Sequence, residues 1–149
     1  LGGTVMVTAG ASNSVGADVS GNGGDVLVAG GYAAGAVGGS IQLLSGFSSA
    51  TSSGDVQVLT ANSGATGVSG GILMETGSAL QSNSGDITLQ VGTSFYGLGG
   101  AVAISGGAAP TSTGGAVTVL SGSGVTSGNI DLATAAATST SGDMSLSVG

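Results

Sequence analysis

The chain has no lysine, arginine, histidine, cysteine or tryptophan, and Pro110 is its single proline among 149 residues. Because proteins bind phosphate groups mainly through Lys and Arg, the absence of both excludes nucleic acid and an anionic membrane surface as partners. Without His or Cys, neither a Ser-His nor a Cys-His nucleophile can be built. A glycosidase-type carboxylate pair stays open, but no basic group stands beside any acid, so we predict that the protein is not an enzyme.

The chain is acidic and rather apolar. Seven Asp and Glu residues give a net charge of −7, and 40% of the residues are hydrophobic. Disordered chains combine high charge with low hydrophobicity, so this composition predicts an ordered protein. No apolar run approaches the ~20 residues that span a bilayer, which predicts no membrane insertion. Because residue 1 is Leu rather than Met, we expect residues 1–149 to be one repeat array within a longer chain.

One pattern fills the chain: a glycine is followed, two and four residues later, by two aliphatic residues. The pattern occurs ten times, mostly 15 residues apart. Its glycines are Gly3, Gly24, Gly39, Gly54, Gly70, Gly85, Gly100, Gly115, Gly128 and Gly142. Its aliphatic pairs are Val5/Val7, Val26/Val28, Ile41/Leu43, Val56/Val58, Ile72/Met74, Ile87/Leu89, Val102/Ile104, Val117/Val119, Ile130/Leu132 and Met144/Leu146. A fixed period of this length is typical of repeat architectures.

The spacing of two within each pair is the strand period, so both aliphatic residues point to one face of an extended segment. Most are β-branched, as half-buried strands prefer. The glycine before each pair is expected to form a tight corner or to take a positive φ angle. One short strand cannot bury its apolar face alone, so neighbouring repeats must stack. The fold predicted is all-β: a parallel β-solenoid, or β-helix, of ten ~15-residue coils with a flattened two-sheet cross-section.

Two other arrangements stay open at this stage. Asp follows the glycine only in even-numbered repeats, which favours coils of about 30 residues made of two repeats. Such coils would stack carboxylates without a cation, which is unfavourable, and the neighbours Gln42 and Gln57 suit the shorter coil. An antiparallel meander closing into a sandwich or barrel is the third arrangement.

Two groups of residues are candidate sites. The Gly-Asp steps contain Asp25, Asp55, Asp86 and Asp143, whose oxygens are ligands that Ca²⁺ accepts. The simpler interpretation is that these carboxylates accept backbone hydrogen bonds at turns, with no metal or other cofactor. The second group is a set of outward leucines that would pack one rod against another: Leu27, Leu44, Leu59, Leu73 and Leu120.

The recurring motif, as in Gly39-Ser40-Ile41-Gln42-Leu43-Leu44-Ser45-Gly46 and Ser84-Gly85-Asp86-Ile87-Thr88-Leu89, resembles repeats of two groups of cell-surface β-solenoid proteins. One group is the large Gly/Ser/Thr-rich extracellular repeat proteins of diatoms and other microalgae. The more distant group is the shafts of filamentous-haemagglutinin-like adhesins. The resemblance covers the whole chain and transfers no functional residue. It implies a secreted or surface-displayed shaft, fibre or adhesive matrix component.

The function predicted is therefore structural: a non-catalytic, glycine-rich repeat segment of an extracellular filament, fibre or adhesin stalk. We expect it to self-associate end to end or laterally, and its Ser/Thr-rich exterior offers positions for O-linked glycans. One alternative is an ice-binding solenoid, although Thr fills no outward column of the repeat. A second alternative is a calcium-stabilised surface-layer or adhesive repeat protein.

Overall fold

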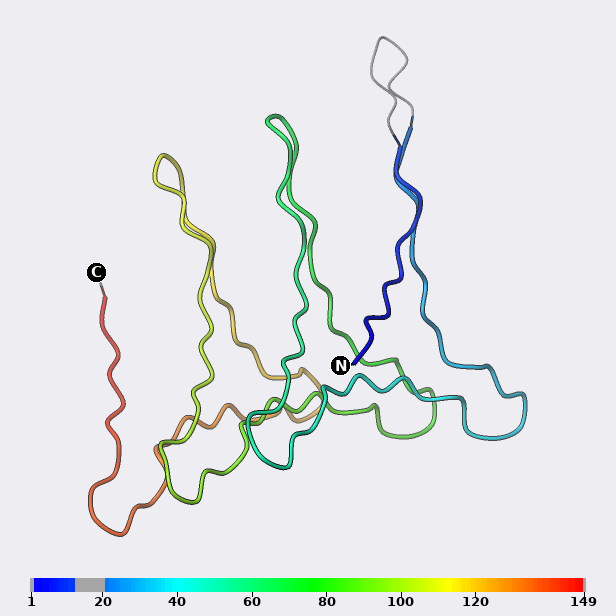
Figure 1. The fold of residues 1–149 in the computed structure, drawn as a ribbon. Helices are drawn as coiled ribbons and strands as arrows, with labels where there is room; N and C mark the ends of the chain where they lie inside the picture. Colours follow the sequence, from blue (N-terminus) through cyan, green and yellow to red (C-terminus); the bar gives the residue numbers. More distant parts are fainter. Residues whose placement is uncertain (1, 13–20, 149) are drawn as a thin grey trace. The chain divides into compact units, whose positions relative to one another are not determined.

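The computed structural model describes residues 2–12 and 21–148, and within these ranges the backbone forms neither a helix nor a β-strand. Figure 1 accordingly shows a plain trace, with no coil or arrow in its described part. In the same ranges there is no helix long and apolar enough to cross a membrane. Extended segments alternate with bends at residues 34–36, 49–51, 65–67, 80–82, 95–97, 110–112, 124–126 and 138–139. Because these bends recur at the spacing of the sequence motif, the sequence repeat is also a structural repeat.

The motif glycine closes the loop that precedes it. The amide of Gly39 donates a hydrogen bond to the carbonyl oxygen of Gly31 at 2.9 Å, and Gly54 donates to Gly46 at 3.0 Å. The same bond joins three further pairs: Gly24 to Gly10, Gly115 to Gly107, and Gly128 to Gly122. A donor and acceptor so close across a short loop bring the chain back on itself. The trace doubles back narrowly at the bends of residues 65–67 and 110–112, whereas the loops around residues 34–36 and 49–51 are wider (Figure 1).

The predicted β-solenoid is wrong, both as ~15-residue coils and as ~30-residue coils, and so is the description of the chain as a β-helix. A solenoid needs corners that turn the chain partway, so that each strand pairs with the equivalent strand one coil away. Here the bonds at the loop bases join residues of a single loop, such as Gly31 and Gly39. Across the part of the chain that the structure describes, no strand pairs with its equivalent in the next repeat. An antiparallel meander is not formed either, because the described ranges contain no strand from which a sheet could be built.

The role expected of the motif glycine also changes. None of the motif glycines that the structure describes has a positive φ angle. What several of them require is space: a Cβ on Gly39 would lie 2.7 Å from the amide nitrogen of Gly31, and one on Gly115 would lie 3.1 Å from that of Gly107. A Cβ on Gly54 would instead make ordinary contact at 3.6 Å with the amide nitrogen of Gly46. Glycine is therefore sterically demanded at some loop bases and not at others.

Two loops are closed by facing pairs of glycines. Gly30-Gly31 lies opposite Gly38-Gly39, and a Cβ on Gly30 would run into the carbonyl oxygen of Gly39. Gly106-Gly107 faces Gly114-Gly115 in the same way, with a Cβ on Gly106 meeting the carbonyl oxygen of Gly115. The doublets thus allow the two backbones to approach more closely than side chains permit.

Contacts divide the chain into two units, Leu1–Met74 and Glu75–Gly149. Each unit contains five copies of the glycine and aliphatic-pair motif. The first unit includes the loop bases of Gly24, Gly39 and Gly54, together with a turn in which the Gly67 amide donates to the Gly64 carbonyl. The second includes the bases of Gly115 and Gly128 and a turn between Ser112 and Ala109. The two units are thus built from the same local element.

Neither unit encloses a core in its described residues, because no side chain there is buried. The first member of each interior aliphatic pair is 46% to 57% exposed, and the second is 67% to 78% exposed. Val5, the first such residue of the chain, is 92% exposed. The narrow ranges over eight repeats show that each interior pair has the same partial cover, whereas Val5 lacks it.

Candidate functional site

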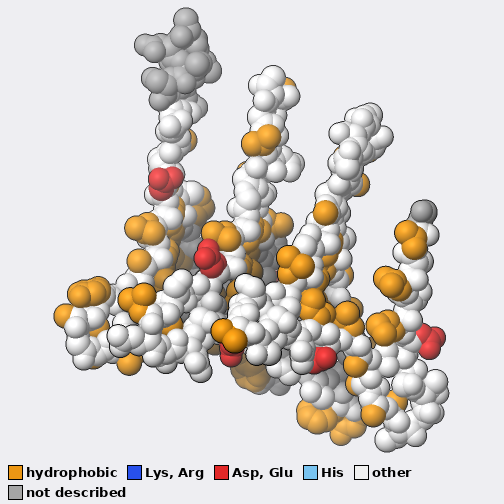
Figure 2. Space-filling model, turned by 180° about the vertical axis from the view of Figure 1, so that it is seen from behind, with side chains coloured by type: hydrophobic (Ala, Val, Ile, Leu, Met, Phe, Trp, Pro, Cys, Tyr) orange, Lys and Arg blue, Asp and Glu red, His pale blue; other side chains and the backbone are white. Residues whose placement is uncertain are grey.

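The described residues enclose no pocket. In the view of Figure 2, apolar side chains are spread over the surface between polar ones, and the acids stand apart from one another. The search for a site therefore concerns four features: the acids, the outward leucines, the loops and the aliphatic pairs.

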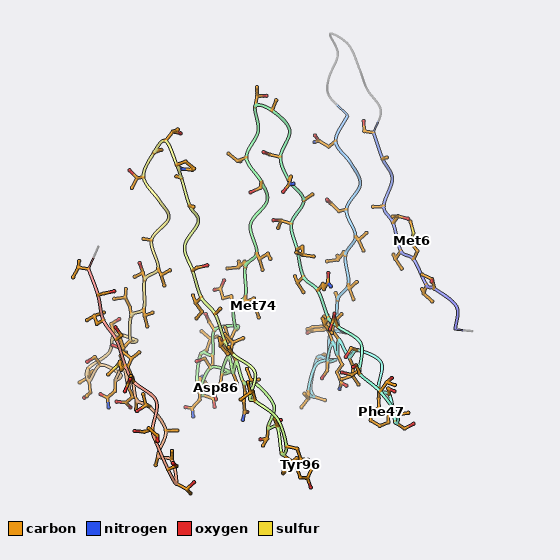
Figure 3. The ribbon with its side chains drawn as sticks, turned by 60° about the vertical axis from the view of Figure 1, so that its left-hand side comes forward. Met6, Phe47, Met74, Asp86 and Tyr96 are labelled. Atoms are coloured by element: carbon orange, nitrogen blue, oxygen red, sulfur yellow. The ribbon has the colours of Figure 1, made fainter. Side chains whose placement is uncertain are left out.

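The four Gly-Asp carboxylates do not converge. Asp25, Asp55, Asp86 and Asp143 are all exposed. Among the residues that the structure describes, no three acidic side chains come close enough together to hold a metal ion. Asp86, drawn as sticks in Figure 3, projects from an extended segment. No side-chain hydrogen bond to these four carboxylates is found in the described ranges either, so the structure does not supply the turn contacts that the simpler interpretation expected.

The outward leucines lie on extended segments and are all strongly exposed. Leu27, Leu44, Leu59, Leu73 and Leu120 are between 80% and 94% exposed. In extended backbone, side chains at odd and even offsets point to opposite sides. The leucines stand three or five residues after a motif glycine, so they lie on the side opposite the aliphatic pairs. Because no side chain in the described ranges is buried, this exposure does not set the leucines apart, and their role in assembly stays a prediction.

The loop tips carry an apolar residue at the bend. Leu80, Phe95 and Val125 stand at or within the bends of their loops and are almost fully exposed. The labelled Phe47 and Tyr96 in Figure 3 likewise lie where the chain turns. No other part of the described structure covers these side chains.

Ser48 and Ser94, which the sequence analysis did not single out, form side-chain hydrogen bonds within two loops. The Ser48 Oγ accepts hydrogen bonds from the amides of Ala50, at 3.3 Å, and Thr51, at 3.0 Å. The Ser48 and Thr51 hydroxyls lie 3.0 Å apart and share a further bond. In another loop the Gly97 amide donates to the Ser94 Oγ at 3.0 Å. A serine hydroxyl in a turn often accepts a hydrogen bond from a backbone amide two or three residues later. The serines in Phe47-Ser48-Ser49-Ala50-Thr51 could therefore have indicated the Ser48 turn from the sequence.

Comparison with protein-family models, curated proteins and solved structures finds no match to this chain. The chemistry available on the described surface is therefore the only guide. That surface offers hydroxyls, scattered carboxylates, unpaired backbone groups and rows of aliphatic side chains. Such a surface can bind water, glycans or another protein surface.

Proposed function

We propose that the protein is a structural, non-catalytic component of an extracellular or cell-surface assembly: a filament, fibre or adhesive stalk built by association of its repeats. The observation that carries the proposal is the accessible surface of the chain, 14839 Å² for 13.5 kDa. A folded monomer of this mass exposes about 6,500 Å², and its fully unfolded chain about 19,600 Å². The chain thus exposes far more surface than a self-sufficient monomer.

The size of this excess sets the scale of the association. It amounts to about 8,000 Å², while a standard protein interface takes only about 800 Å² from each partner. The exposed aliphatic residues belong to all ten repeats rather than to one patch. Contacts distributed along the whole chain are what a fibre or matrix component needs, whereas a single binding patch would use a small part of them.

The composition supports the non-catalytic part of the proposal. His, Cys, Lys and Arg are absent from the sequence, and the part of the chain that the structure covers has no pocket in which carboxylates converge. The hydroxyl-rich loops and the net charge of −7 supply hydration and mutual repulsion, which keep an assembly soluble at its surface. An extracellular location is consistent with the resemblance of the sequence motif to repeats of cell-surface proteins.

Electron microscopy of the purified chain, at rising concentration in physiological salt, tests this proposal. We expect elongated or laterally associated particles that grow with concentration. Sedimentation velocity on the same samples should show species larger than 13.5 kDa. Monodisperse single chains at every concentration would contradict the proposed function.

A further inference from the structure

The extended segments leave their backbone hydrogen-bonding groups largely unused. Folded proteins form about one internal hydrogen bond per residue. Over the described ranges, the backbone forms seven backbone-to-backbone bonds. Five of these lie at loop bases, and the other two, Gly67 to Gly64 and Ser112 to Ala109, lie within loops. Extended segments with free N–H and C=O groups are templates for strand pairing with another chain.

The aliphatic pairs stand beside these free backbone groups. Val56 and Val58, for example, lie between the loop base at Gly46–Gly54 and the next bend, and both are more than half exposed. Pairs with nearly the same exposure occur in each interior repeat. Backbone pairing that also buries alternate side chains is how an added strand is usually recognised. The aliphatic pairs and their flanking backbone therefore form a row of equivalent docking positions along each unit.

The leucine side of the segments is a weaker surface, although its members are more exposed. The position five residues after each motif glycine reads Thr8, Ala29, Leu44, Leu59, Glu75, Gln90, Ser105, Leu120, Ala133 and Ser147. Polar residues and the acid Glu75 interrupt this column. The aliphatic pairs are interrupted in no repeat. A partner that pairs along the chain thus meets continuous apolar contact on one side only.

We propose that the aliphatic pairs and the free backbone beside them form a strand-pairing surface for a second copy of this chain. This inference depends on the proposed assembly function and names the surface that performs it. A second copy is the partner favoured, because a row of sites about 15 residues apart is matched by a chain with the same spacing. The excess surface of each copy is about ten times what a standard interface takes from one partner, so both sides of a segment can be occupied.

The salt dependence of binding distinguishes a second copy of this acidic chain from a cationic partner. Two copies with seven acids each repel one another, and salt screens that repulsion, with a Debye length falling from about 30 Å at 0.01 M to about 10 Å at 0.1 M. Self-association should therefore strengthen as salt rises. Binding to a basic partner should weaken over the same range.

Sedimentation velocity and infrared spectroscopy of the full chain, from about 0.01 M to about 0.5 M salt, provide the test. We expect assembly to grow with salt together with the infrared band of intermolecular β-structure. In a pair variant, Val56→Thr, Val58→Thr, Val117→Thr and Val119→Thr keep the side-chain shape and the strand preference but lose apolar contact. We expect it to need at least about tenfold more protein for half assembly, which corresponds to about 1.4 kcal/mol.

The matched control is a leucine variant with the same number of changes on the other side: Leu27→Thr, Leu44→Thr, Leu59→Thr and Leu120→Thr. We expect its half-assembly concentration to stay within about threefold of the wild type, or under about 1 kcal/mol. An unchanged pair variant, an equal loss in both variants, or assembly without new β-structure would each overturn the strand-pairing surface while leaving the assembly function standing. Both the strand-pairing surface and the assembly function would be overturned by a wild-type chain that stays monomeric at all salt concentrations. They would also be overturned by a chain that binds added polylysine, as a basic partner, but not itself.

Discussion

At the residue scale, the repeat is held by glycines whose roles differ although their place in the motif is the same. Gly39 sits so close to Gly31 that a Cβ would lie 2.7 Å from its amide nitrogen. Gly54 has 3.6 Å to the equivalent nitrogen of Gly46, which is ordinary contact. Glycine at the same motif position is thus sterically required at Gly39, whereas the loop base at Gly54 has room for a Cβ.

The first prediction contrasts Gly39→Ala with Gly54→Ala. In G39A the new methyl group forces the loop base apart and breaks the bond to Gly31, which is worth about 0.5–1.5 kcal/mol. Hydrogen exchange of the residue 39 amide should therefore speed up by roughly tenfold at the upper end of that range. In G54A the amide should exchange as in the wild type or more slowly, because Ala restricts the unfolded chain. Equal acceleration in both variants would contradict this distinction.

A second residue-scale prediction concerns Ser48. Its Oγ accepts two loop amides, whereas the neighbouring Ser49 makes no side-chain hydrogen bond in the described structure. Ser48→Ala should expose the Thr51 amide and accelerate its exchange by a few fold, in line with a net hydrogen bond of about 1 kcal/mol. Ser49→Ala is the matched control and should leave that amide unchanged. Identical exchange in the two variants would show that the Ser48 contacts do not order the loop.

At the element scale, the recurring feature is a loop closed at its base by two glycines. Five such loops are joined at their bases by a glycine-to-glycine hydrogen bond of 2.8–3.0 Å. A Cβ on Gly54 would lie 3.8 Å from the Cβ of Ser45, which is within the Cβ separation that a disulfide spans. A solenoid would bring a motif glycine next to the motif glycine of the following coil instead. The two arrangements therefore predict different cross-links.

The third prediction uses this difference. A chain with Ser45→Cys and Gly54→Cys should form an internal disulfide on mild oxidation in dilute solution, because the Cβ atoms at these two positions would lie 3.8 Å apart. A chain with Gly54→Cys and Gly70→Cys tests the solenoid pairing and should remain reduced or cross-link between molecules. Non-reducing electrophoresis and mass measurement distinguish these products. Preferential internal closure of the second pair would show that neighbouring repeats pair, which would contradict the described fold.

At the scale of the whole molecule, the decisive feature is surface that stays uncovered. No side chain in the described ranges is buried, and the aliphatic residues of every repeat remain at least partly exposed. Hydrophobic burial is the dominant favourable term in folding and association. Under the proposed assembly, the chain gains most of its stability when neighbouring copies cover that surface.

The fourth prediction follows for calorimetry. An ordinary domain of 149 residues unfolds with an enthalpy of about 100 kcal/mol near 60 °C and a heat-capacity increase of about 2 kcal/mol/K. The dilute chain in low salt should show less than about a third of either quantity, because it has little apolar surface left to expose. Concentrated, assembled chain should show a larger transition that shifts with concentration. A full-sized transition in dilute solution would mean that a single chain already buries a core.

The sequence by itself determined the period, the extended segments and the position of the loops. Glycine spacing and the alternation of aliphatic residues are local properties, and the structure repeats with them. The same pattern predicted that Leu27, Leu44, Leu59, Leu73 and Leu120 face outward from a core, but no core forms in the described ranges, so their placement stays a prediction. Strand formation was not predictable in this way, because an apolar pair in extended backbone becomes a strand only when another segment satisfies its N–H and C=O groups.

Only the tertiary structure decided how one repeat follows the next. A connection of Gly, Ser, Thr and Ala suits an open corner and a closed loop equally well in sequence. The choice depends on the distance across the loop base, as between Gly31 and Gly39. Glycine permits both geometries because it has no Cβ, so its presence in the sequence does not distinguish them. The close approach of two backbones eight residues apart closes the loop, and in the described ranges no strand forms to pair one predicted coil with the next.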